Sequence, residues 1–280
     1  MRVLATVALA LASSTTLACS DASALDEGRD GTAALECREP FDFEFVPDTL
    51  GGDEAYVCFA FDRSAFAGET ISKVLWSPPT GGAFALHHAI LYAVPGEFSD
   101  GPVICDGMPE AAVGLHVWSI GGDDLELPVD TALVLPNGTE RFVVEAHTLR
   151  VADGAPESGR VRLCAGSTNP ANEAALMGTG APVPAIRPMH QEISEGSCAL
   201  AGDVHLFSVW PHMHRVGKEI SAELVRATGA ATPLVDVTSW DFASQRTYPL
   251  DVNAAGGDAV RVRCVWENPS ADYVLPGPKT

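Results

Sequence analysis

Three groups of histidines are the candidate metal ligands of this chain. They are the adjacent His87 and His88, the single His147, and the pair His212 and His214. Neutral imidazole is the commonest metal ligand in proteins, and clustered imidazoles suit transition metals. Each group therefore has to be weighed as a metal site against a structural role.

His87 and His88 lie within the apolar run Phe84–Tyr92, which is typical of a buried strand. Neighbouring residues on a regular strand face opposite sides, so both rings can reach one ion only if the backbone bulges or twists. One ring could then use Nδ1 and the other Nε2. Two buried imidazoles without a metal would need partners for all their ring nitrogens, which favours ligation.

His212 and His214 are two residues apart, and residues with this spacing on a strand share a face, so both rings could reach one ion. Met213 would then point the other way. The alternative is a pair of polar residues at a strand end, because Pro211 precedes the pair and Gly217 follows it. His-x-His alone does not decide between the two.

His147 stands alone in the run Arg141–Leu149, where a single strand histidine is more often structural. Glu145 shares its face and could accept a hydrogen bond from a neighbouring ligand. The remaining histidines belong to no cluster and are interpreted as structural: His116, His190 and His205.

The donor types indicate which metal to expect. Imidazole sets without carboxylate, with or without a thioether, suit copper better than calcium or magnesium, and zinc is the main rival. The sequence lacks the His-Glu-x-x-His motif of zinc proteases and a phosphate-binding loop. We therefore expect copper at these histidines.

Short strands separated by turns must position these residues. The expected strands are 55–61, 71–76, 84–93, 115–120, 132–135, 141–149 and 160–164, then 203–210, 219–226, 234–237, 247–252 and 259–266. Asn137-Gly138 between two apolar runs predicts a hairpin. The pattern indicates an all-β protein with two antiparallel β-sandwich domains of jelly-roll type.

Composition places the domain boundaries. Residues 37–168 form the expected first domain and residues 189–280 the second, with a linker rich in Pro and Gly at 169–188. Within this linker, Asn172–Met177 is the one notable helix candidate.

The N-terminus predicts export. Residues 1–24 resemble a signal, with 25–36 as a linker, because Arg2 precedes a short apolar stretch. Two processing routes remain open: Cys19 as the lipidated residue of a bacterial lipobox, or cleavage after Ala24. We expect a cell-envelope lipoprotein or a secreted or periplasmic protein, held at a membrane only by such an anchor.

Cysteine usage and charge agree with this interpretation. Apart from Cys19, six scattered cysteines without a Cys-x-x-Cys pair favour disulfides over a zinc cluster. Lys and Arg number 17 against 37 Asp and Glu, giving a net charge of -20, which argues against a nucleic-acid partner and a polybasic membrane-surface protein.

Four segments together resemble the copper type II, ascorbate-dependent monooxygenases, the family of dopamine β-monooxygenase and peptidylglycine α-hydroxylating monooxygenase. They are Tyr56-Val57-Cys58, His87–Tyr92, Val144–His147 and His205–Lys218. Their order and spacing match over most of the chain from Cys37 onward, and the combination is specific. The fold of that family, two eight-stranded antiparallel jelly-roll domains, agrees with the strand pattern.

The resemblance implies two copper ions in a complete chain. His87, His88 and His147 correspond to a three-histidine copper site in the first domain. His212 and His214 correspond to two ligands of the second copper, where the family reaction takes place.

The resemblance also implies disulfides and a reaction. Cys58 with Cys105, and Cys37 with Cys164, match disulfides of the family. The family reaction inserts one oxygen atom of O2 into an aliphatic C–H bond of a small substrate, with ascorbate as reductant. No protein partner is inferred.

Two departures from the family pattern matter. Peptide-amidating members carry Arg where this chain has Trp210, so a glycine-ended peptide is a poor substrate. The Met that completes the second copper site belongs to an Asp-Glu-Met-Cys segment expected beyond Thr280, and of the methionines within the chain Met189 is the first to consider in its place. We therefore expect a bacterial exported member whose second domain is incomplete.

An incomplete second domain has structural consequences. Cys198 and Cys264 would lack partners unless they pair with each other, and apolar surface would be exposed around Val262, Val265 and Trp266. The chain would then be inactive by itself. Two alternatives to a monooxygenase are a non-catalytic copper-binding lipoprotein and a metal-free β-sandwich interaction domain.

Overall fold

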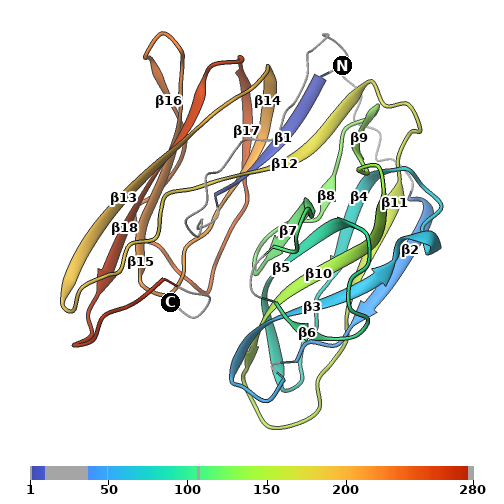
Figure 1. The fold of residues 1–280 in the computed structure, drawn as a ribbon, viewed down its shortest axis with the longest axis horizontal. Helices are drawn as coiled ribbons and strands as arrows, with labels where there is room; N and C mark the ends of the chain where they lie inside the picture. Colours follow the sequence, from blue (N-terminus) through green and yellow to red (C-terminus); the bar gives the residue numbers. More distant parts are fainter. Residues whose placement is uncertain (1, 10–36, 49, 106–107, 277–280) are drawn as a thin grey trace. The chain divides into compact units, whose positions relative to one another are not determined.

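The computed structural model describes residues 2–9, 37–48, 50–105 and 108–276 (Figure 1). Strands and turns make up nearly all of this part, together with one short 3-10 helix, η1, Arg63–Ala65. The all-β prediction is confirmed. The chain divides into two compact units, here called the N-terminal unit, Glu27–Ala175, and the C-terminal unit, Leu176–Thr280 with Met1–Asp26.

Two antiparallel sheets face each other in the N-terminal unit. The first has the order β6-β3-β10-β5-β7, with bounds Val103–Ile104, Glu54–Asp62, Thr139–Arg150, Phe84–Pro95 and Val113–Ser119. The second runs β9-β4-β11-β2, with bounds Thr131–Val134, Thr70–Ser77, Gly159–Ala165 and Arg38–Phe45, and β8, Leu125–Glu126, pairs with β4. The unit is a β-sandwich, and its jelly-roll connectivity stays a prediction.

Strand β10 packs on both faces of its sheet, because its consecutive side chains from Phe142 to Thr148 are buried. On one face, Phe142 packs against Phe43 of the opposite sheet, with ring centroids 6.4 Å apart, and against Phe66 at 5.8 Å. On the other face, Val143 joins a smaller cluster with Tyr92 and the two cysteines of a disulfide. The alternation of strand side chains therefore sends Val143, Glu145 and His147 to this second face.

Both disulfides implied by the resemblance are present, Cys37–Cys164 and Cys58–Cys105. The first ties the start of the N-terminal unit to β11. The second ties β3 to the residue that follows β6. Disulfides persist in oxidising compartments, so both bonds are consistent with an exported protein.

Removing Cys58–Cys105 should destabilise the N-terminal unit. The bond closes a loop with a sequence separation of 47, and replacing both cysteines with Ala should lower the free energy of unfolding by about 2–4 kcal/mol. Urea unfolding monitored by circular dichroism measures the change. An equal urea midpoint for the variant and the wild type would show that the disulfide does not stabilise the unit.

The C-terminal unit also contains two sheets. One has the order β13-β18-β15-β16, with bounds His190–Ala199, Ala259–Asn268, Gly217–Val225 and Ala231–Val237. In the other, β17, Tyr248–Ala254, pairs antiparallel with β14, Val204–Pro211, and β1, Arg2–Leu9, pairs parallel with β14. The start of the expected export signal therefore forms a strand, whereas Cys19 and Ala24 lie outside the described residues.

The expectation of exposed apolar surface in the C-terminal unit is wrong. Val262, Val265 and Trp266 are buried, because β18 lies between β13 and β15 rather than at a sheet edge. Cys198 is disulfide-bonded, and Cys264 is a free, buried cysteine, so the two do not pair with each other. Burial raises the pKa of the Cys264 thiol to about 12.

Two local predictions are also wrong. Asn172–Met177 is not a helix but part of strand β12, Asn172–Thr179, whose first residues pair with β9. Asn137-Gly138 makes a turn, with Gly138 at φ 78, but not a hairpin. The strands that it joins, β9 and β10, belong to the two different sheets of the N-terminal unit.

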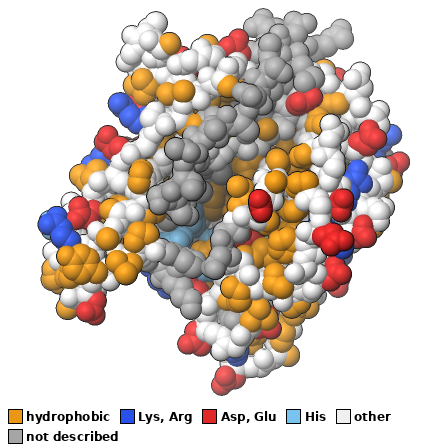
Figure 2. Space-filling view, viewed as in Figure 1, with side chains coloured by type: hydrophobic (Ala, Val, Ile, Leu, Met, Phe, Trp, Pro, Cys, Tyr) orange, Lys and Arg blue, Asp and Glu red, His pale blue; other side chains and the backbone are white. Residues whose placement is uncertain are grey.

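The surface carries the expected acidity. On the face that Figure 2 shows, Asp and Glu side chains are scattered among exposed hydrophobic ones, and the Lys and Arg side chains do not gather into one patch. Within the described residues, the structure has no helix of the length and hydropathy needed to cross a membrane.

Candidate metal centre

His87, His88 and His147 come together on the two neighbouring strands β5 and β10. His88 pairs directly with His147, and Thr148 pairs with Leu86. His87 is therefore the extra residue of a β-bulge. The expected bulge is confirmed, and it brings adjacent histidines, which a regular strand would place on opposite faces, to one site.

The three imidazoles are in mutual contact. Nδ1 of His87 lies 3.2 Å from Nδ1 of His88, and the ring of His147 lies 5.1 Å from the first and 4.8 Å from the second, centroid to centroid. Each ring offers one nitrogen such that all three lie within 4.8 Å of one another. The two Nδ1 atoms face each other at 3.2 Å, and the use of Nδ1 by one ring and Nε2 by the other in binding a metal stays a prediction.

Two residues of β3 fix the third imidazole. Nε2 of His147 lies 2.8 Å from Oε1 of Glu54, and the ring of Tyr56 stacks on that of His147 at 4.2 Å and 5°. A carboxylate accepts a hydrogen bond, so the proton of the neutral imidazole sits on Nε2. The lone pair of His147 is then on Nδ1, the nitrogen that can bind a metal.

Glu145 does not take the role that its spacing predicted. Its carboxyl is buried and accepts a hydrogen bond from the Tyr92 hydroxyl, beside the sulfurs of Cys58 and Cys105. Burial raises the pKa of the Glu145 carboxyl to about 7. The carboxylate hydrogen-bonded to a histidine of the cluster is Glu54, on the neighbouring strand.

The cluster suits a late transition metal. All three side chains are nearly inaccessible to water, with 3% of His87, 3% of His88 and 1% of His147 exposed. Protonating three imidazoles in contact within such a site would bury several charges without compensation, so neutral rings with converging lone pairs are favoured. Three neutral imidazoles are ligands for copper or zinc rather than for calcium or magnesium.

His212 and His214 follow the end of a strand instead of lying within one. Strand β14 ends at Pro211, and the two rings, 5.2 Å apart, stand at 77° to each other. The expectation that they share a strand face is therefore wrong, although the rings are still neighbours. Trp210, the last large residue of β14, stacks on His212 at 4.9 Å and 17°.

Gln245 fixes the orientation of His212. Its Oε1 lies 2.8 Å from Nδ1 of His212, and its Nε2 donates to the carbonyl oxygen of Phe242 at 3.2 Å. The amide oxygen therefore accepts the Nδ1 proton of the ring. The lone pair of His212 is left on Nε2, on the side away from Gln245, where it can bind a metal.

A comparison with known protein families gives one match. Residues 172–280 match the copper type II ascorbate-dependent monooxygenase, C-terminal domain. The matched stretch contains His212, His214 and Gln245. Over this stretch, which is less than half of the chain, the sequence is similar to that domain. No curated protein matches the sequence. That family is copper-dependent, so copper rather than zinc is the metal to expect at the histidines of the matched stretch.

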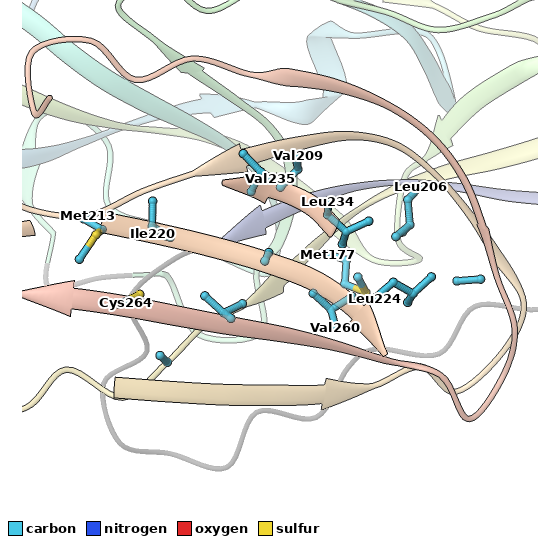
Figure 3. Packing of buried hydrophobic residues seen from close by; sticks show 14 of the residues in the cluster. Met177, Leu206, Val209, Met213, Ile220, Leu224, Leu234, Val235, Val260 and Cys264 are labelled. Atoms are coloured by element: carbon cyan, nitrogen blue, oxygen red, sulfur yellow. The ribbon is translucent and has the colours of Figure 1, made fainter. Parts of the chain in front are cut away.

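Met213, between the two histidines, is part of the core of the C-terminal unit. Its side chain is fully buried in the main hydrophobic cluster, beside Ile220 (Figure 3). Gly217 makes this packing possible, because a Cβ there would lie 2.7 Å from Cβ of Met213. Met189, the first methionine to consider as a ligand, is 74% exposed. Among the described residues, no Cys, Asp, Glu or further His joins His212 and His214 in a three-ligand group.

His116 has a structural role, as expected. Nε1 of Trp76 donates to its Nδ1 at 2.9 Å, and burial lowers the pKa of the ring to about 3. The folded protein therefore keeps His116 neutral at a pH where the unfolded chain takes up a proton.

This burial predicts a pH dependence of stability. As the pH falls from about 6.5 toward about 3, His116 should reduce the free energy of unfolding by up to about 1.4 kcal/mol per pH unit. His116→Gln keeps an acceptor for the Trp76 indole and removes the titrating ring. Thermal unfolding from pH 7 to pH 4 should show a shallower loss of stability in this variant, and identical slopes would contradict the assignment.

Glu54 and Gln245 are the site residues that sequence reasoning missed. Glu54 lies immediately before the apolar run of its strand, and it is far from His147 in the sequence. Gln245 lies in a segment between β16 and β17 with no periodic pattern. Only the pairing of β3 with β10 could have indicated Glu54, because it places the start of β3 beside the end of β10.

Proposed function

We propose that this protein uses copper to insert one oxygen atom of O2 into an aliphatic C–H bond of a small substrate, with an ascorbate-type reductant. The observation that carries the proposal is the pair of histidine sites. One has three converging imidazoles in a water-excluded cluster, and the other has two histidines within the matched monooxygenase domain.

The balance of the reaction explains the need for two sites. Hydroxylation of a C–H bond places one oxygen atom in the product and releases the other as water, which consumes two electrons and two protons. Copper, when bound, changes between its +1 and +2 states and so supplies one electron at each site. Ascorbate, a monoanion, gives up two electrons and one proton, and the second proton comes from solvent.

The chain's own residues prepare each site for this work. The bulge at His87 and the hydrogen bond from His147 to Glu54 aim three nitrogens inward without a rearrangement. Burial of the cluster excludes substrate and water, which favours electron storage over chemistry at this site. His212 and His214 follow a strand end, and His214 is only partly buried, so this pair is the better place for substrate and O2.

The proposal extends to location. An exported protein meets O2 and keeps its disulfides, and Cys37–Cys164 and Cys58–Cys105 both fit such a compartment. We therefore place the protein in the cell envelope or outside the cell. A lipid on Cys19 or cleavage after Ala24 would each be visible as the mass of the N-terminal peptide of the mature protein.

Copper loading followed by oxygen uptake tests the proposal. The C-terminal unit lacks the exposed apolar surface on which the expectation of an inactive chain partly rested. We therefore expect two copper ions per chain by mass spectrometry of the metal content, and O2 uptake that requires both copper and ascorbate. A non-catalytic copper-binding protein would hold copper without sustained uptake. A preference for zinc over copper, or no bound metal, would overturn the proposal.

A further inference from the structure

We propose that Glu54 and Gln245 give the two histidine sites opposite redox preferences. The anionic acceptor behind His147 favours Cu(II) at the three-histidine site, and the neutral acceptor behind His212 leaves Cu(I) favoured at the other. The inference rests on the proposed function, because it concerns the copper that these histidines would hold. It makes Glu54 and Gln245 positioning residues that also set the direction of electron flow.

The two hydrogen bonds form a matched pair. Nε2 of His147 lies 2.8 Å from Oε1 of Glu54, and Nδ1 of His212 lies 2.8 Å from Oε1 of Gln245. Both acceptors are side-chain Oε1 atoms, one in a carboxylate and the other in an amide of nearly the same shape. Because the distances agree, the two hydrogen bonds differ mainly in the charge of the acceptor rather than in their length.

Burial gives that charge its effect. The side chain of His147 is 1% exposed and that of Glu54 is 20% exposed, so little water screens the interaction. A carboxylate that accepts the imidazole proton increases the basicity of the ring, and a more basic ligand stabilises the more highly charged ion. Glu54 therefore stabilises Cu(II) more than Cu(I).

Gln245 offers no such charge. Its side chain is buried, and its amide is held in one orientation by the Phe242 carbonyl oxygen. It selects the tautomer of His212 without adding electron density to the ring. An electron is thus held less tightly at the site backed by Glu54, which makes the three-histidine site the donor and the His212 site the acceptor.

Exchanging the two acceptors tests the inference. Glu54→Gln keeps a hydrogen-bond acceptor at His147 and removes the charge, and Gln245→Glu adds the charge at His212. Each is measured in a full-length chain with one copper, Glu54→Gln with His212→Ala and Gln245→Glu with His147→Ala. The readout is the Cu(II)/Cu(I) reduction potential from a redox titration followed by electron paramagnetic resonance.

We expect Glu54→Gln to lower the ratio of Cu(II) to Cu(I) affinity about tenfold, which raises the potential by about 59 mV for one electron. Gln245→Glu should shift the other site by a similar amount in the opposite direction. Glu54→Asp should restore most of the wild-type potential. Asp53→Asn and Gln191→Glu, at exposed neighbouring or distant positions, make the same charge changes and should shift neither potential.

The outcomes separate this inference from the proposed function. Suppose that the wild type binds copper and consumes O2 with ascorbate, but that neither exchange shifts its reduction potential more than the control variant does. The redox inference is then wrong, and the proposed function is still supported. If Glu54→Gln weakens copper binding but the copper that remains bound keeps the wild-type potential, Glu54 has only a structural role and the inference is overturned. If the wild type binds no copper, both fall.

Discussion

Replacing His147 with Ala should reduce the copper content of the chain from two ions to one. His147 supplies one of three converging nitrogens, and it is the one that Glu54 and Tyr56 hold in place. Loss of a residue that merely supports a ligand weakens metal binding by about 10–100-fold, so loss of a ligand should exceed 100-fold. Metal analysis after dialysis against a weak chelator measures the effect.

The matched control is His116→Gln, which removes another buried histidine of the same unit and should leave both copper ions bound. His147→Gln, closer to the native side-chain volume, serves if the alanine variant fails to fold. Far-ultraviolet circular dichroism of each variant reports the fold. Two copper ions retained in a folded His147 variant would show that the three-histidine cluster is not a copper site.

Replacing His212 with Ala should abolish oxygen uptake while the three-histidine copper remains. The ring is held by Gln245 on one edge and by Trp210 on one face, so its position is fixed before any metal binds. Losing this ligand removes several kcal/mol of stabilisation from the reaction, and we expect at least a ~1000-fold lower rate. An oxygen electrode with ascorbate in excess measures the rate.

His205→Ala is the control for this variant. His205 lies on the same strand, β14, and its Nδ1 is 3.0 Å from Oδ1 of Asn253, away from any histidine cluster. It should retain both copper ions and the wild-type rate. Wild-type uptake by the His212 variant would assign the oxygen chemistry to another place in the molecule.

The strands were the most predictable part of the fold. Residues 84–93 and 141–149 were expected as strands, and they lie within β5 and β10, because apolar β-branched and aromatic runs bounded by turn residues carry a strong local signal. Strand β13 was missed. Its alternation is weak, since it is largely exposed and interrupted by Gly196.

Pairing and connectivity were less predictable than the strands. Asn137-Gly138 has the local chemistry of a hairpin turn, but nothing local states whether the strands on either side pair with each other. The choice depends on which sheet offers more buried area to β9 and β10, and the structure places them in different sheets. Asn172–Met177 likewise became a strand because β9 offered it a partner.

The candidate site was predictable where one segment carries the information. The adjacent pair His87 and His88 required a bulge, and the bulge is present. Glu145 was chosen as the hydrogen-bonding carboxylate because it shares a face with His147 on the same strand. The residue that fills this role, Glu54, comes from another strand, and such a contact exists only once the register between β3 and β10 is known.

Isotope labelling follows the oxygen atom that the proposed hydroxylation transfers. The copper-loaded chain is incubated with ascorbate, 18O2 and the small molecules of the cell envelope and medium, and products are screened by mass spectrometry. We expect a product that carries one oxygen atom from 18O2, formed by the wild type and by His205→Ala but not by His212→Ala. Products whose oxygen comes from water, or whose formation persists without copper, would contradict it.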